Sequence, residues 1–194
     1  PQPSIPVSPT TPSVRIGVPT APVPLPDTSA PYPCPDDAER AHYSSCLVLN
    51  VQSMNPSASS TSRWKVPDIS AYIHDERARN HFLPFVALTE TWLKPYMADA
   101  QLHVPGYTVS RCDRSGRVGG GVLLYSHVNI PVSECDTFDD GTCEGLFCRF
   151  STINTCVVVA YRPPNAPLSS FNSLLEFIST CIHRVNDESY DIMI

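Results

Sequence analysis

Short apolar runs divided by polar or glycine-rich segments are the feature that most constrains the fold of this chain. The runs are only four to seven residues long, and polar residues or glycines bound them. Runs of that length are typical of buried strands, whereas a helix needs about ten or more residues. Strands are therefore predicted at residues 46–49, 85–88, 107–113, 122–125, 144–150, 155–161 and 190–194.

Two further segments have the pattern of helices. Asp68 stands directly before residues 69–73, where apolar side chains recur at helical spacing, and is predicted to cap a short helix. Residues 171–185 place apolar side chains at i, i+3, i+4 and i+7 and predict a longer helix, with Ser169 or Ser170 as its N-cap. Hairpins combined with two separated helices predict an α/β protein whose helices pack outside a sheet.

The N-terminal segment differs in composition from the rest. Twelve of the 21 prolines lie in residues 1–35. Proline lacks the backbone N–H and fixes φ, so neither a helix nor a strand ladder can propagate through such a segment. Residues 1–43 are predicted to be a disordered, partly polyproline-II tail, and residues 44–194 to form the folded domain. The tail is either a docking segment for an SH3-like partner or an unselected linker.

Charge and cysteine content exclude several classes of protein. A net charge of −6 argues against a chain coated in positive charge, but not against a nuclease that handles phosphate with metal ions and a few arginines. No run approaches the roughly 18 apolar residues of a membrane span, so no membrane association is expected. The eight cysteines include no Cys-x-x-Cys pair, which favours reduced thiols in an intracellular protein.

Three polar residues follow or end predicted strands, and they are Asn50, Glu90 and Tyr161. If those strands are neighbours, the three side chains meet at one rim of the sheet, where folds of this class place their sites. An amide and a carboxylate together suit Mg²⁺, and a tyrosine hydroxyl could bind a phosphate oxygen. The alternatives are that Asn50 caps a turn, that Glu90 is a surface charge and that Tyr161 belongs to the core.

Four local strings occur in a definite order along the chain. They are Leu-Asn-Val-Gln-Ser at 49–53, Leu-Thr-Glu-Thr-Trp-Leu at 88–93, Arg-Cys-Asp-Arg-Ser-Gly-Arg-Val-Gly-Gly-Gly-Val at 111–122 and Ala-Tyr-Arg-Pro-Pro-Asn at 160–165. Read together, they resemble the endonuclease/exonuclease/phosphatase superfamily. Within it they are most similar to the apurinic-type endonuclease domain of LINE-type non-LTR retrotransposons. The resemblance runs from about residue 45 to residue 194.

The resemblance implies a fold, a reaction and roles for the three polar residues. The family fold is a four-layer α/β sandwich, and its members are phosphodiesterases or phosphatases that use Mg²⁺, with Mn²⁺ as a possible substitute. Asn50 and Glu90 match the residues that place the metal, and Tyr161 matches the tyrosine that supports the scissile phosphate. In the retrotransposon members the enzyme nicks chromosomal DNA in the nucleus, and the freed 3′-hydroxyl primes reverse transcription.

The chain also departs from the family pattern. A Gly-Asp-x-Asn motif, a later Asp and a C-terminal Asp-His pair cannot be mapped onto this sequence. The chain is therefore expected to be a truncated, partial sandwich with the first sheet, its helices and one strand of the second sheet. It is expected to lack activity alone and to expose an apolar sheet face. The alternatives are another phosphoesterase of the superfamily, or a non-catalytic remnant that binds DNA or a partner.

Arg111 lies near the end of the predicted strand at 107–113, and Arg114 and Arg117 follow that strand. The three arginines are predicted to contact DNA phosphates as a local positive patch, and the alternative is a solvated loop paired with Asp113. The glycines that follow are predicted to form a bend into the next strand, because no helix begins after them as a phosphate-binding loop requires. Trp92 either stacks on a base or packs beneath the Glu90 loop.

Overall fold

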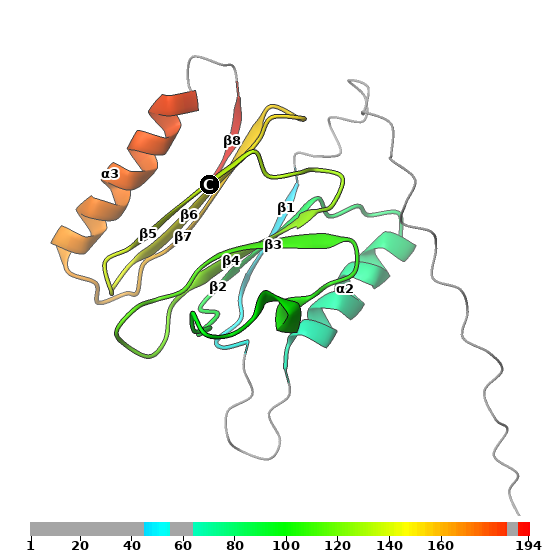
Figure 1. Cartoon of the computed structure of the whole chain (residues 1–194), viewed down its shortest axis with the longest axis horizontal. Coiled ribbons are helices and arrows are strands. Elements are labelled where there is room, and N and C mark those ends of the chain that lie inside the picture. Colours follow the sequence, from blue (N-terminus) through cyan, green and yellow to red (C-terminus); the bar gives the residue numbers. More distant parts are fainter. Residues whose placement is uncertain (1–44, 55–63, 186–189) are drawn as a thin grey trace, which may run out of the picture. The chain divides into compact units, whose positions relative to one another are not determined.

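The computed structural model describes residues 45–54, 64–185 and 190–194 (Figure 1). The chain divides into two units, Pro1–Ala30 and Pro31–Ile194, and all described residues belong to the second. The predicted disordered tail at residues 1–43 lies outside the described residues.

The described strands form two four-stranded sheets, which confirms the α/β class. The first sheet has the order β1-β2-β4-β3, with β1 parallel to β2 and the other neighbours antiparallel. Its strands are β1 (Cys46–Asn50), β2 (Phe85–Thr89), β3 (Tyr107–Cys112) and β4 (Val122–His127). The second sheet has the order β5-β6-β7-β8, with β8 parallel to β7. Its strands are β5 (Glu134–Asp139), β6 (Glu144–Phe150), β7 (Thr155–Tyr161) and β8 (Asp191–Met193).

The two sheets share one apolar core. Side chains of Phe85 and Leu124 from the first sheet pack in the same cluster as Leu146 and Val157 from the second. The rings of Phe85 and Phe150 lie with centroids 4.8 Å apart. Strand alternation sends the intervening residues of each sheet to its other face. Strands β4 and β6 are therefore apolar on both faces, which explains their continuous apolar runs.

Each sheet carries a helix on the face turned away from this shared core. Helix α2 (Val66–Ala78) packs Ile69 and Ile73 against the first sheet, and helix α3 (Leu168–Val185) packs Leu174 and Val185 against the second. A short 3₁₀ helix, η2, covers Asp99–Leu102. None of the helices in the described ranges is long and apolar enough to cross a membrane.

Two sequence predictions about the architecture were wrong. The second sheet has four strands instead of one, so it covers the apolar face that was expected to be exposed. Periodicity identifies a strand but not the sheet it joins. Strand β5 was missed because three of its four half-buried positions are acidic, so it has no apolar run.

The predicted helix caps were also wrong. Lys65 occupies the N-cap of α2 without a side-chain cap, and Asp68 lies inside the first turn. Helix α3 begins at Leu168, so Ser169 and Ser170 lie within it. In α2 a proline supplies the start signal instead, because its missing N–H costs nothing in the first turn.

Candidate active site

Asn50, Glu90 and Tyr161 meet around one carboxylate oxygen. Asn50 Nδ2 donates a hydrogen bond of 2.8 Å to Glu90 Oε1, and the hydroxyl of Tyr161 donates another of 2.8 Å to the same oxygen. The three residues are separated by 40 and 71 positions in the sequence. Sequence reasoning placed all three at one rim, and the structure brings them together there.

Strand register explains why Asn50 and Glu90 are neighbours. Parallel pairing of β1 with β2 sets Asn50 beside Thr89, the residue before Glu90. The pairing continues past both strands, because Ser53 N donates to Glu90 O at 2.7 Å. Tyr161 reaches the same oxygen from the end of β7, so the cluster joins the two sheets.

Several non-glycine residues around the cluster have positive φ angles, which residues with a side chain rarely adopt. Glu90 has a φ of 56° and Trp92 a φ of 54°, and on the facing segment Gln52 and Ser53 have values of 44° and 88°. Non-glycine residues rarely occupy this region, and such strain concentrates at functional sites. Asn50 stabilises its own turn, because its Oδ1 accepts a hydrogen bond of 3.2 Å from Gln52 N. Asn50 therefore has the turn role as well as the contact with Glu90.

The hydrogen bonds fix the protonation states of the cluster. The pKa of Glu90 lies below its usual value, first because of the Asn50 hydrogen bond and then because of that from Tyr161. Burial, followed by the hydrogen bond to Glu90, raises the pKa of Tyr161 to about 12. At neutral pH Glu90 is thus an anion, and Tyr161 is a neutral donor directed at it.

The glycine run at residues 119–121 forms backbone hydrogen bonds with the loop that carries Glu90. Trp92 N donates to Gly120 O at 2.9 Å, and Thr91 N donates to Gly121 O at 3.2 Å. Gly120 has a φ of 67°, and a Cβ atom there would overlap the guanidinium of Arg114. The run therefore forms the predicted bend into β4, and the close approach of Arg114 requires glycine at 120.

A buried ion pair between Arg114 and Glu144 lies next to the cluster. The guanidinium of Arg114 binds both carboxylate oxygens of Glu144, and the Nη2 to Oε2 distance is 3.0 Å. The side chains are only 6% and 0% exposed. Gly121 N also donates to Glu144 at 3.1 Å, and Arg114 lies over the Tyr161 ring at 5.7 Å. The pair therefore connects the loop before β4 to the second sheet beside Tyr161.

The structure does not form the predicted patch of three arginines. Arg114 is buried against Glu144, and the guanidinium of Arg111 pairs with Asp99 at 2.9 Å and Asp113 at 3.4 Å. Only Arg117 of the three is exposed. Two of the three guanidinium groups are therefore already paired with carboxylates. Arg111 pairs with Asp113 as the alternative expected, but it does so as a mostly buried residue of β3 and not in a solvated loop.

Other charged and aromatic side chains surround the cluster. Trp92 is 37% exposed, and its side chain donates a hydrogen bond to Glu90. Lys94 Nζ donates to Arg117 O at 3.2 Å and thereby links the two loops that flank Glu90. Sequence reasoning missed Lys94 and Glu144. An acidic residue opening an otherwise apolar strand was the available signal for Glu144.

The described residues offer few ligands for a metal. No group of three or more His, Cys, Asp or Glu side chains within the described ranges is arranged to hold an ion. Glu90 supplies one ionised carboxylate, and Asn50 supplies an amide oxygen. Such a donor set fits Mg²⁺, which is commonly bound through one or two carboxylates and keeps several water ligands.

No family model matches the chain, and no curated protein matches it. Among solved structures, the chain is similar to an AP endonuclease from Archaeoglobus fulgidus, with 13% sequence identity and a TM-score of 0.48. The similarity covers 72% of this chain and 51% of that one, so the chain spans about half the length of that enzyme.

Proposed function

We propose that this chain is part of a Mg²⁺-dependent DNA endonuclease of the endonuclease/exonuclease/phosphatase superfamily, from the branch found in non-LTR retrotransposons. The observation that carries the proposal is the convergence of Asn50 and Tyr161 on one oxygen of Glu90. All three lie in the sequence strings that resemble that branch, and all three meet at strand ends.

The proposed fold is the four-layer sandwich of that superfamily. Three sets of contacts support this proposal: α2 packs on the first sheet, the two sheets pack on one another, and α3 packs on the second sheet. The chain would contribute the part of the sandwich that holds Glu90.

The chemistry proposed is hydrolysis of a phosphodiester bond by water. Bound at Glu90 with Asn50 nearby, Mg²⁺ or Mn²⁺ would act as a Lewis acid toward phosphate oxygens. The lowered pKa of Glu90 keeps the carboxylate ionised and ready to hold a cation. Tyr161 stays protonated, so its hydroxyl can donate a hydrogen bond to a phosphate oxygen in place of Glu90.

DNA is the proposed partner, and the loops beside Glu90 are the proposed contact surface. Trp92 is exposed enough to stack on a base, and Lys94 and Arg117 lie together on the two flanking loops. These three residues replace the patch of Arg111, Arg114 and Arg117 as the proposed DNA contact. The cleavage step would take place in the nucleus, and an SH3-like partner for the tail stays a proposal.

This chain alone is proposed to have negligible nicking activity. Members of a catalytic constellation act as a unit, so a site with one carboxylate retains little of the rate. The described part of the chain offers only Glu90 and Asn50 near the proposed metal position.

A plasmid assay tests the proposal. Supercoiled plasmid with Mg²⁺ is incubated with this chain, with the full product of the reading frame that encodes it, and with the Glu90→Gln variant of each. We expect nicking by the full product, at least a 100-fold loss on Glu90→Gln, and no detectable nicking by this chain. Glu176→Gln on α3 is the matched control and should leave nicking unchanged.

Each of the other outcomes would contradict a particular part of the proposed function. Equal nicking by the Glu90→Gln variant would overturn the site, and rapid nicking by this chain would overturn the proposed inactivity. Cleavage of small phosphate esters without plasmid nicking would indicate another phosphoesterase of the superfamily. Salt-sensitive DNA binding by the full product without cleavage would indicate a non-catalytic remnant.

A further inference from the structure

Two cysteines lie directly opposite one another in the second sheet. Antiparallel pairing of β5 with β6 sets Cys135 against Cys148, and the Cys148 thiol donates a hydrogen bond to Cys135 Sγ at 3.7 Å. Residues directly opposite in an antiparallel pair have Cα atoms about 4.5–5.5 Å apart, which is within the range that a disulfide bridges. Neither cysteine forms a disulfide in the structure. The backbone thus holds two free thiols at a spacing that a disulfide needs.

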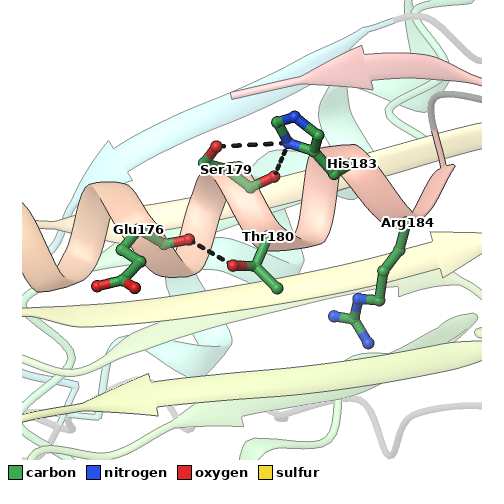
Figure 2. A pocket seen from close by; sticks show the side chains of 5 residues that line it. All are labelled: Glu176, Ser179, Thr180, His183 and Arg184. Carbon is green, nitrogen blue, oxygen red and sulfur yellow. Dashed lines mark hydrogen bonds between the residues drawn. The ribbon is translucent and has the colours of Figure 1, made fainter.

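The two thiols differ in access. Cys135 is exposed on β5, an edge strand of the second sheet, whereas Cys148 is fully buried in the core between the sheets. Glu134 and Asp136 alternate with Cys135 and bind Arg184 of α3. Figure 2 shows Arg184 leaving α3 on the side opposite His183. The alternation therefore directs Cys135 away from α3, to the same side as Cys148.

The hydrogen bond between the thiols also changes their acidity. The bond from Cys148 is the largest cause that lowers the pKa of Cys135 to about 7, and the same bond raises the pKa of Cys148, with burial adding to it. For Cys46, Cys112, Cys143 and Cys181, burial instead raises the pKa. The thiolate is the reactive form, so the exposed thiol of the pair is also the more nucleophilic at neutral pH.

We propose that Cys135 and Cys148 form a modification site for small-molecule disulfides such as oxidised glutathione, which converts the pair into a cross-strand disulfide. The Cys135 thiolate attacks one sulfur of the small disulfide, forms a mixed disulfide and releases one small thiolate. The Cys148 sulfur then attacks Cys135 Sγ, and the proton of the Cys148 thiol leaves with the second small thiolate as a thiol. Two protein thiols and one small disulfide thus become one protein disulfide and two small thiols.

The bond would tie an edge strand to the interior of its sheet. The disulfide would close a short loop between residues 13 positions apart. Such a loop lowers the conformational entropy of the unfolded chain and thereby favours the folded state. Asp139 at the end of β5 also accepts a hydrogen bond of 2.7 Å from Ser115 N, in the loop that carries Arg114. Oxidation is therefore expected to raise the Tm by several degrees, and a reductant should reverse the rise.

Peptide mapping of the full chain under non-reducing conditions tests the proposal. The reduced chain is incubated with oxidised glutathione, both as it is and with Cys34→Ser, because Cys34 lies outside the described residues. We expect a peptide cross-linked between Cys135 and Cys148 in both. Cys148→Ser should stop at glutathione attached to Cys135, and Cys135→Ser should react at least ten-fold more slowly at Cys148.

Three results would overturn the proposal. They are stable glutathione on Cys135 of the unsubstituted chain without a cross-link, a cross-link between other cysteines, and an unmodified pair. The Tm provides a second readout, and a Tm that falls on oxidation would contradict a bond that fits the native sheet. None of these results depends on nuclease activity.

Discussion

Each end of the first sheet carries a titratable residue, but one of these residues is partly exposed and charged, whereas the other is buried and neutral. At one end, Glu90 is partly exposed, has a positive φ and accepts hydrogen bonds that lower its pKa. At the other end, His127 is 5% exposed beside the rings of Phe82 and Tyr107, with centroids 5.0 and 5.4 Å away. Burial lowers the pKa of His127 to about 4, so it is neutral at pH 7.

The difference distinguishes a buried polar residue that belongs to the core, His127, from one that a ligand can reach, Glu90. His127 is kept uncharged because its surroundings are aromatic and dry, and a charge there would have no compensation. Glu90 is kept charged by hydrogen bonds from Asn50 and Tyr161, and its side chain is partly exposed. Four changes test this contrast.

The largest effect is expected at the buried ion pair that supports the Glu90 end. Arg114→Met leaves Glu144 buried without its counter-charge, and breaking such a pair costs about 3–5 kcal/mol. Urea unfolding at pH 7 measures the loss. Arg79→Met, which removes an exposed ion pair with Glu76, is the matched control and should cause no measurable change. A loss below about 1 kcal/mol for Arg114→Met would show that the pair does not support this end.

The next effect concerns the His127 end and appears on acidification. The folded pKa of His127 is depressed to about 4, so between pH 6.5 and 4 only the unfolded state takes up the proton. The free energy of unfolding should therefore fall by about 3 kcal/mol across that window, and not change above it on account of His127. His127→Gln should remove this slope in urea unfolding at a series of pH values. His74→Gln, at an exposed histidine, should retain it.

Glu90 is expected to cause a smaller fall in the free energy of unfolding, at a pH more acidic than the His127 window. Its folded pKa is lowered, so its stabilising contribution is present above the ordinary carboxyl pKa and is lost as the pH falls through the folded pKa. Glu90→Gln should remove that contribution, about 1 kcal/mol or less because the group is partly exposed. The slope between pH 6.5 and 4.5 should stay unchanged. A change in that window instead would mean that the two ends are coupled.

The last change tests DNA binding at Trp92, whose side chain is 37% exposed. Trp92→Ala removes the indole that is proposed to stack on a base. Fluorescence anisotropy with a single-stranded oligonucleotide should show DNA affinity about ten-fold weaker, in line with the loss of one stacked base. Tyr72→Ala replaces an exposed aromatic on α2 and should leave the affinity unchanged. Equal losses from both variants would remove Trp92 from the contact surface.

The sequence predicted the site better than the architecture around it. Asn50, Glu90 and Tyr161 could be predicted because each ends or follows an apolar run, and strand ends meet at a rim. The buried pair of Arg114 and Glu144 could not, because charged residues are normally exposed and nothing local shows that their partners come from another sheet.

The missed elements have the same kind of cause. The half-buried positions of strand β5 are mostly acidic, and Arg184 of α3, far along the chain, binds Glu134 and Asp136. Pairing between strands is non-local, so a short pattern shows that a strand exists but not where it lies. The N-cap at Asp68 failed because the proline two positions after Lys65 starts the helix earlier.

Binding of Mn²⁺ to this chain tests most directly whether Glu90 holds a divalent cation. Electron paramagnetic resonance would follow the loss of the free Mn²⁺ signal at pH 7 for the unsubstituted chain, Glu90→Gln and the Glu176→Gln control. We expect one site that Glu90→Gln weakens at least ten-fold, about 1.4 kcal/mol, while Glu176→Gln leaves it unchanged. Equal Mn²⁺ binding by all three proteins would contradict the proposed metal site.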